Sequence, residues 1–138
     1  MPPTPAQTRP CQIFVVEDHA RLRSLLETFF SMQEDIVCCG AASSAEEALP
    51  LIEAQQPDIV VADLSLPEMS GIDLIRQLRT ARPGLRCIIL SGHNESRYAT
   101  QAIEAGAVGY ILKGNPKEIA DAVRRCHQGE TVLSEGLD

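Results

Sequence analysis

The chain has 138 residues, of which 44% are hydrophobic and 22% charged, a length and composition that suit one globular domain with its own apolar core. Its formal net charge of −7 and its lack of any lysine or arginine run exclude the basic surface that binding to a phosphate backbone requires, so we expect no DNA binding by this chain alone. No apolar run approaches the roughly 20 residues that cross a bilayer, and the five cysteines form no CxxC pair, so we expect a cytoplasmic protein without a membrane span.

The first predicted structural unit is a strand followed by two acids and a helix. Residues 1–11 are rich in proline and are predicted to form a flexible tail. Residues 13–16 are apolar and partly β-branched, which indicates a short buried strand, and Glu17 and Asp18 follow it directly. A helix is predicted over residues 19–32. Its apolar face is expected to consist of Leu22, Leu25, Leu26, Phe29 and Phe30.

Residues 36–41 form the second predicted strand, and Ser44 opens the helix that follows it. The spacing of Ser44 and Glu47 is that of a capping box. Pro50 falls in the second turn of this helix, where a proline removes one backbone hydrogen bond at a cost of roughly 3 kcal/mol. We therefore expect either a kink at Pro50 or a helix that begins near it.

The third predicted strand ends on a single carboxylate. Residues 59–61 are β-branched, too few for a helix and apolar on both faces, which is typical of a buried parallel strand that ends at Asp63. Ligands bind at that end of the strands in open parallel sheets. Asp63 could instead be a helix cap or a turn residue. That alternative fits poorly because the turn and the next cap are already supplied by Pro67, Ser70 and Gly71.

Two further strands also run into polar residues. Residues 87–90 form the fourth predicted strand, which Ser91 follows. Residues 108–112 form the fifth, which Lys113 follows. The repeated pattern of a buried strand and then a chemically useful side chain is more informative than any one of these residues.

Three more helices separate and follow these strands. One is capped by Ser70 and ends at Pro83, and the last begins at Pro116 and stops at Gly129. The helix between them is predicted over residues 95–105 and has a thin apolar face. The residues expected on that face are Ala99, Ala102 and Ile103.

Five strands that alternate with five helices predict a single doubly wound α/β domain with a five-stranded parallel sheet. The periodicity leaves two strand orders open, the flavodoxin-like 2-1-3-4-5 order and a short Rossmann variant. A dinucleotide-binding Rossmann fold needs a glycine fingerprint after the first strand, and residues 17–20 read Glu-Asp-His-Ala instead. The sequence therefore argues against dinucleotide binding.

Because the carboxyl ends of parallel strands share one edge, we expect Glu17, Asp18, Asp63, Ser91 and Lys113 to lie close together. Two carboxylates about 4 Å apart repel by about 1 kcal/mol in water and about 4 kcal/mol near a protein surface, so three acids need compensation. A small set of carboxylate oxygens suits Mg²⁺. One carboxylate could then attack phosphorus, while the lysine offsets charge and the hydroxyl donates to a phosphoryl oxygen.

As an ordered set, these residues resemble the response regulator receiver domain, the CheY-like module of two-component signalling, over about residues 12–129. The matching residues are Glu17, Asp18, Asp63, Pro67, Gly71, Ser91, Tyr110 and Lys113. The resemblance implies the 2-1-3-4-5 strand order and phosphorylation of Asp63 by a phosphohistidine on a sensor histidine kinase. It also implies a Mg²⁺ ion held by Glu17, Asp18, Asp63 and the main-chain carbonyl of Ser65. Ser91 and Tyr110 are the implied switch pair, which would reshape the surface of the fourth helix, fifth strand and fifth helix.

The beginning and end of the sequence are most similar to receivers of the NarL/FixJ type, which continue through a linker into a helix-turn-helix DNA-binding domain. We therefore expect residues 130–138 to be a C-terminal tail or the start of such a linker, and the output to be control of transcription. Homodimer formation on phosphorylation is left open. The sequence departs from the commoner pattern at Glu17, where many receivers have aspartate, and at Gly114, where many have proline.

Two other functions are weighed against a phosphoacceptor signalling domain that performs only its own phosphorylation and slow dephosphorylation. One is a Mg²⁺-dependent phosphohydrolase of the haloacid dehalogenase type. That chemistry needs a second aspartate two residues after the nucleophile, and Ser65 occupies this position. The other is a receiver-like docking module that is never phosphorylated, which the retention of the whole set of site residues disfavours.

Overall fold

The computed structural model describes residues 9–138, so most of the predicted N-terminal tail lies outside the described residues. Six parallel strands form one sheet in the order β2-β1-β3-β4-β5-β6. The strands are β1 (Cys11–Val16), β2 (Ile36–Ala42), β3 (Ile59–Asp63), β4 (Arg86–Ser91), β5 (Gly109–Leu112) and β6 (Val132–Leu133). The helices are α2 (Ala20–Ser31), α3 (Ala45–Gln55), α4 (Gly71–Ala81), α5 (Ser96–Glu104) and α6 (Pro116–His127).

The first five strands have the predicted flavodoxin-like order, but the expectation of a five-stranded sheet is wrong. The sixth strand, β6, pairs in parallel with β5 through Gly109–Val132 and Tyr110–Leu133. It lies in the segment for which we predicted a tail or the start of a linker. Two residues are too few to give a strand pattern in a sequence, so only the packing against β5 defines this strand.

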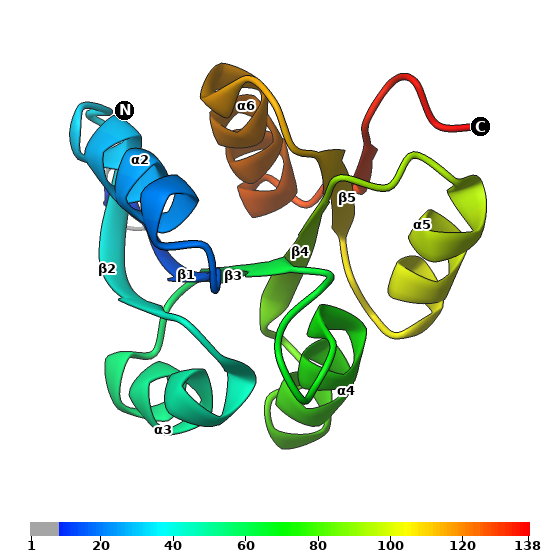
Figure 1. The fold of residues 1–138 in the computed structure, drawn as a ribbon. Helices are drawn as coiled ribbons and strands as arrows, with labels where there is room; N and C mark the ends of the chain where they lie inside the picture. Colours follow the sequence, from blue (N-terminus) through cyan, green and yellow to red (C-terminus); the bar gives the residue numbers. More distant parts are fainter. Residues whose placement is uncertain (1–8) are drawn as a thin grey trace.

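The helices cover both faces of the sheet (Figure 1), and each face has its own apolar core. Leu26 of α2 and Val123 of α6 pack against one face, whereas residues of α3, α4 and α5 pack against the other. Every residue of β3 is buried, because this strand is central and its side chains alternate between the two cores. The apolar cores on the two faces of the sheet therefore hold the carboxyl end of β3 in place.

Pro50 is accommodated inside a continuous helix. The α3 helix begins at Ala45, where the hydroxyl oxygen of Ser44 accepts a hydrogen bond of 3.2 Å from the backbone N–H of Glu47. The expectation that this helix begins near Pro50 is therefore wrong. Pro50 and the residue whose carbonyl loses its partner, Glu46, are both exposed, so water can satisfy that carbonyl at little cost.

Four residues that we expected in the core are not buried: Leu25 is exposed, and Leu22, Phe29 and Ile103 are half-buried. Leu25 is 51% exposed, because it lies about 100° around the helix from its buried neighbour Leu26. Ile103 is half-buried, so Ala99 and Ala102 alone form the buried face of α5. The helix therefore packs on small side chains, as its thin apolar stripe predicted.

Two further observations concern membrane-spanning helices and disulfide bonds. Within residues 9–138, no helix has the length and apolar character needed to cross a membrane. All five cysteines are free thiols, and three of them are buried.

Arg124 joins α6 to the turn between α2 and β2. Its guanidinium donates to both carboxylate oxygens of Asp35, at 2.7 and 3.1 Å, and to the side-chain oxygens of Gln33 at 2.7 Å and Asp121 at 2.9 Å. Because several charge-assisted bonds are lost together, we expect Arg124→Ala to lower the free energy of unfolding by about 1–2 kcal/mol in urea denaturation.

The matched control for this prediction is Arg125→Ala. Among residues 9–138, the Arg125 side chain pairs only with exposed Glu130, so its removal is expected to cost less than about 1 kcal/mol. Equal effects of the two substitutions would show that the Arg124 contacts across the fold add nothing.

Candidate functional site

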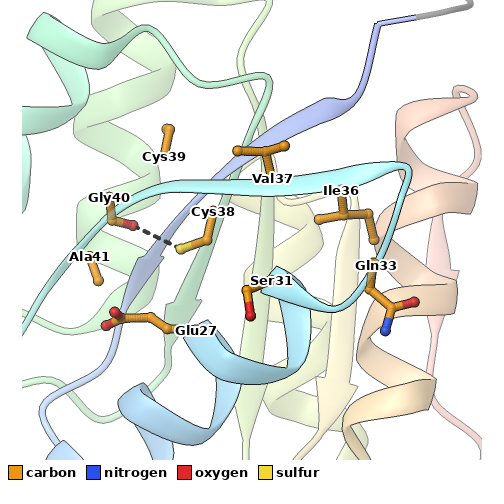
Figure 2. A pocket seen from close by; sticks show the side chains of 9 residues that line it. All are labelled: Glu27, Ser31, Gln33, Ile36, Val37, Cys38, Cys39, Gly40 and Ala41. Carbon is orange, nitrogen blue, oxygen red and sulfur yellow. Dashed lines mark hydrogen bonds between the residues drawn. The ribbon is translucent and has the colours of Figure 1, made fainter.

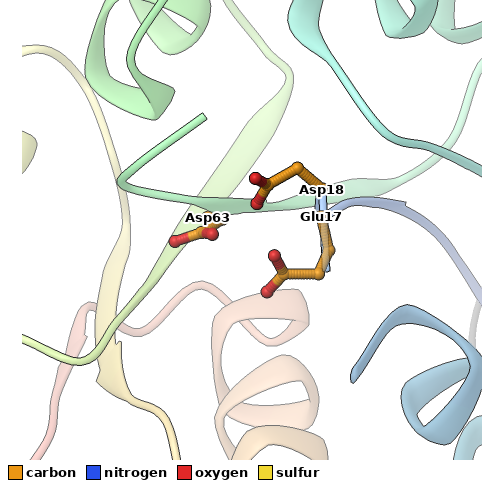
Figure 3. Close-up of side chains that lie close together, drawn as sticks. All are labelled: Glu17, Asp18 and Asp63. Carbon is orange, nitrogen blue, oxygen red and sulfur yellow. The ribbon is translucent and has the colours of Figure 1, made fainter. Parts of the chain in front are cut away.

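Four neighbouring strands bring the predicted site residues to one edge of the sheet. Glu17 follows β1, Asp63 ends β3, Ser91 ends β4 and Lys113 follows β5. The backbone continues the sheet there, since the N–H of Glu17 donates to the carbonyl of Ala42 and the N–H of Lys113 donates to that of Ser91. Figure 3 shows the carboxylates of Glu17, Asp18 and Asp63 directed toward one another.

The three acids form a compact cluster. One carboxylate oxygen from each of Glu17, Asp18 and Asp63 lies within 4.8 Å of the other two. Glu17 and Asp63 are buried, while Asp18 is exposed. The Nζ atom of Lys113 lies 3.0 Å from Oε1 of Glu17 and 3.0 Å from Oδ2 of Asp63. The lysine therefore neutralises part of the charge that the acids concentrate.

The electrostatics of the cluster follow from burial. Loss of water, and then the neighbouring carboxyl group of Asp63, raise the pKa of Glu17 to about 7. Partial burial disfavours the charged form of Lys113, but its contacts with Glu17 and Asp63 outweigh this and raise its pKa. The ammonium group therefore stays charged at neutral pH.

The backbone of the loop after β3 contacts the side chain of Asp63. The N–H of Ser65 donates a hydrogen bond of 3.1 Å to Oδ1 of Asp63. The N–H of Gly71 donates to the carbonyl of Leu64, at 3.0 Å, where α4 begins. Coordination of a metal by the main-chain carbonyl of Ser65 stays a prediction.

The side chains of Ser91 and Tyr110 both contact the backbone of His93. The hydroxyl oxygen of Ser91 accepts from the N–H of His93 at 2.9 Å, and the hydroxyl of buried Tyr110 donates to the carbonyl of His93 at 2.8 Å. Both contacts use the backbone of His93, so its residue type gives no signal. A displacement of either hydroxyl must therefore disturb this loop.

Arg23 is a second residue whose role the sequence did not reveal. Its guanidinium donates to the main-chain carbonyl of Glu17 at 2.8 Å, and the N–H of His19 donates to Oε2 of the same residue at 3.1 Å. These contacts fix the backbone and the carboxylate of Glu17.

A pocket of about 380 Å³ lies along β2 (Figure 2), away from the acidic cluster. Its thiol Cys38 donates to the carbonyl of Gly40 at 3.3 Å, and burial raises its pKa to about 11. A protonated thiol is a poor nucleophile and a poor metal ligand. Burial therefore works against nucleophilic or metal-binding chemistry at Cys38.

The sequence matches the family described as response regulator receiver domain over residues 13–124. The chain belongs to this family. It is a receiver domain of the NarL/LuxR type of two-component response regulator, a signalling domain rather than an enzyme in the usual sense.

Curated relatives of this receiver include a transcriptional regulatory protein and a response regulator. It is 36% identical over 126 residues to the uncharacterized transcriptional regulatory protein YhcZ of Bacillus subtilis, covering 91% of this chain and 59% of YhcZ. It is 34% identical over 129 residues to the nitrate/nitrite response regulator NarL of Escherichia coli K12, covering 93% of this chain and 60% of NarL. The chain thus spans about three-fifths of the length of these relatives.

Solved structures give the same family and fold. A two-component response regulator of the LuxR family from Aurantimonas sp. SI85-9A1 superposes with a TM-score of 0.88 at 31% identity, covering 93% of this chain and 92% of that chain. The receiver domain of the putative response regulator NarL from Mycobacterium tuberculosis superposes with a TM-score of 0.83 at 28% identity, covering 88% of this chain and 99% of that chain.

The cluster of this receiver fits a divalent cation. Oε1 of Glu17 is buried and has no partner with hydrogen-bond geometry, although the Lys113 ammonium lies beside it. The carboxylate oxygens of Glu17, Asp18 and Asp63 lie within 4.8 Å of one another, and carboxylate oxygens are ligands that Mg²⁺ prefers. The residues present therefore suit the ion that receivers bind.

The raised pKa of Glu17 predicts a pH dependence of stability for the metal-free receiver. Between the ordinary pKa of 4.5 and about 7, the unfolded chain loses a proton that the folded chain keeps. The free energy of unfolding should therefore fall as pH rises through this window, by on the order of 1–3 kcal/mol, and level off above it. Urea denaturation in EDTA at pH 5 and pH 8 measures this change.

Glu17→Gln is the control, because an amide does not titrate. The wild type should lose stability relative to this variant as pH rises from 5 to 8. A constant difference between the two proteins would show that Glu17 ionises normally in the folded state.

Proposed function

We propose that this receiver accepts a phosphoryl group on Asp63 from a phosphohistidine of a sensor histidine kinase. The observation that carries the proposal is the convergence of Asp63 with two further acids and one lysine at the carboxyl end of the sheet. In the reaction, a carboxylate oxygen of Asp63 forms a bond to phosphorus. The bond between phosphorus and the histidine nitrogen breaks, and that nitrogen keeps the electron pair as imidazole leaves.

Glu17, Asp18, Asp63 and the main-chain carbonyl of Ser65 would hold Mg²⁺, which neutralises charge on the transferred group when it is bound. Lys113 already contacts Oδ2 of Asp63, so its ammonium is placed to offset charge on a phosphoryl group at that carboxylate. The Ser91 hydroxyl is expected to donate to a phosphoryl oxygen. To do so it must give up its contact with the N–H of His93.

The switch would proceed from that lost contact. Once Ser91 moves, its hydroxyl no longer holds the N–H of His93, so the carbonyl of His93 that accepts from Tyr110 can shift as well. We propose that this rearrangement reshapes the α5–β5–α6 surface. The α5 helix buries only Ala99 and Ala102, so a shift of this helix breaks few apolar contacts.

The proposed output is control of transcription, through a helix-turn-helix DNA-binding domain such as NarL-type regulators carry. Residues 12–129 would act as the receiver, and the linker would follow the segment of residues 130–138 that packs against it. We propose that the protein works in the cytoplasm without direct DNA binding by this chain, and that phosphorylation can promote homodimer formation.

The test uses acetyl phosphate as a small phosphodonor. In the presence of Mg²⁺, intact mass spectrometry should show one added phosphoryl group per chain, and EDTA should prevent the addition. Steady turnover of a phosphate ester by the purified chain would favour the phosphohydrolase alternative. No addition under any condition would favour the docking module.

A further inference from the structure

The residues after β6 run back across the molecule toward α5, as the C-terminal segment in Figure 1 shows. We call residues 134–138 the strap. Its first residue is bound to β5 twice. The N–H of Ser134 donates to the carbonyl of Tyr110 at 3.0 Å, and its hydroxyl oxygen accepts from the N–H of Leu112 at 2.8 Å. The strap thus begins as an extension of the sheet.

The far end of the strap binds the loop between β4 and α5. The N–H of Asp138 donates to the carbonyl of Asn94 at 2.8 Å, and the carbonyl of Asp138 accepts from the N–H of Ser96 at 3.0 Å. Ser96 is the first residue of α5, and the N-cap residue Glu95 makes no side-chain capping bond. The main chain of the strap therefore satisfies a backbone donor that the helix itself leaves unpaired.

Two residues between these ends hold the strap down. Gly136 has a φ of +88°, a backbone conformation that side chains rarely adopt, and it makes the turn toward α5. Leu137 is half-buried and packs against the core beneath α3, α4 and α5. The strap is thus a packed part of the domain.

The loop that the strap binds is also the loop that the switch residues bind. On one side, the hydroxyls of Ser91 and Tyr110 both contact the backbone of His93. On the other side, the strap contacts the next residue, Asn94. A loop held by three groups at two adjacent residues cannot follow a moving Ser91 hydroxyl without changing its contacts with the strap.

We propose that the strap is an inhibitory restraint, which holds the loop and the start of α5 in the arrangement of the unphosphorylated chain. This inference rests on the proposed phosphorylation of Asp63. Release of the strap and occupancy of Asp63 then favour one another, because coupling between two sites is reciprocal. Loosening the strap should raise the affinity of the site, and filling the site should loosen the strap.

The first experiment measures the strap itself. Beryllofluoride with Mg²⁺ serves as the phosphoryl mimic, and NMR follows amide hydrogen exchange in the 138-residue chain. On saturation, the amides of Ser96, Ser134 and Asp138 should exchange at least about threefold faster, whereas the amide of Val61 in the central strand should not. Saturation that leaves these three amides unchanged would overturn the inference and leave the proposed function intact.

The second experiment measures the site. Leu137→Ala removes the apolar anchor and Ser134→Ala removes the acceptor for the N–H of Leu112. Each should lower the Kd for beryllofluoride with Mg²⁺ by about 3- to 10-fold. Glu135→Ala is the matched control, because Glu135 is an exposed residue of the same strap and should leave the Kd unchanged.

Both Leu137→Ala and Ser134→Ala are tested because either substitution could prevent folding. The experiment needs only one of the two variants to fold with a cooperative urea transition. Unchanged or weaker binding by the folded variants would overturn the inference. If the wild-type chain does not bind beryllofluoride at all, the proposed function fails and the inference fails with it.

Discussion

An Asp63→Asn variant is expected to accept no phosphoryl group from acetyl phosphate, whereas the wild type accepts one. Asparagine has nearly the same shape as aspartate and can still accept the hydrogen bond from the N–H of Ser65, so the loop should keep its structure. An amide is not a nucleophile toward phosphorus at neutral pH, so the reaction loses its acceptor. Intact mass spectrometry and peptide mapping measure the result.

Asp58→Asn is the matched control for this prediction. Asp58 lies just before β3, at the amino-terminal end of the strand and therefore far from Asp63. Its carboxylate accepts from the N–H of Gln12 at 2.8 Å. The control should be phosphorylated like the wild type. A phosphoryl group on the Asp63→Asn variant would place the acceptor elsewhere and end the proposal.

Gly71→Ala is expected to destabilise the fold by about 3 kcal/mol or more, the largest effect on stability that we predict for a single methyl group. A Cβ atom at Gly71 would clash with the main-chain oxygen of Asp63 and lie 3.0 Å from Cδ1 of Ile89. The first contact is with backbone, which no side-chain rotation can relieve. Either α4 or the end of β3 must move, and urea denaturation measures the cost.

The same substitution should also damage the site, because a displaced Asp63 backbone carries its carboxylate away from Lys113. We expect at least about tenfold weaker binding of beryllofluoride with Mg²⁺ by the folded fraction. Gly84→Ala is the control, since a Cβ there meets no atom within 4 Å and the backbone φ is not positive. A stability loss as large for Gly84→Ala as for Gly71→Ala would contradict the steric explanation.

The sequence predicted the parallel core well because its signals are local. Runs such as residues 59–61 are too short and too apolar for anything except buried strands, and Ser44 and Ser70 cap helices where their positions indicated. Because parallel strands end at one edge, the proximity of Glu17, Asp63 and Lys113 could also be predicted. Their chemical roles stay predictions.

The errors have a common origin in tertiary contacts. Strand order depends on which buried faces meet, so periodicity left two orders open and only the family resemblance chose between them. The short strand β6 exists because β5 offers it an edge, and the contacts of the strap depend on that pairing. The prediction that Leu25 lies in the core was wrong, because the spacing of apolar residues identifies the apolar face of a helix but not how much of that face the sheet covers.

Tyr110 is an intrinsic spectroscopic probe of the loop after β4. The sequence contains no tryptophan and two tyrosines, so its ultraviolet emission and its aromatic circular dichroism are dominated by two tyrosine rings. Tyr98 lies under the guanidinium of Arg97 on α5, and Tyr110 is enclosed in the core with its hydroxyl on the loop carbonyl. Both rings flank the loop after β4. A rearrangement of that loop can therefore be followed optically in the unlabelled protein, in real time and at micromolar concentration.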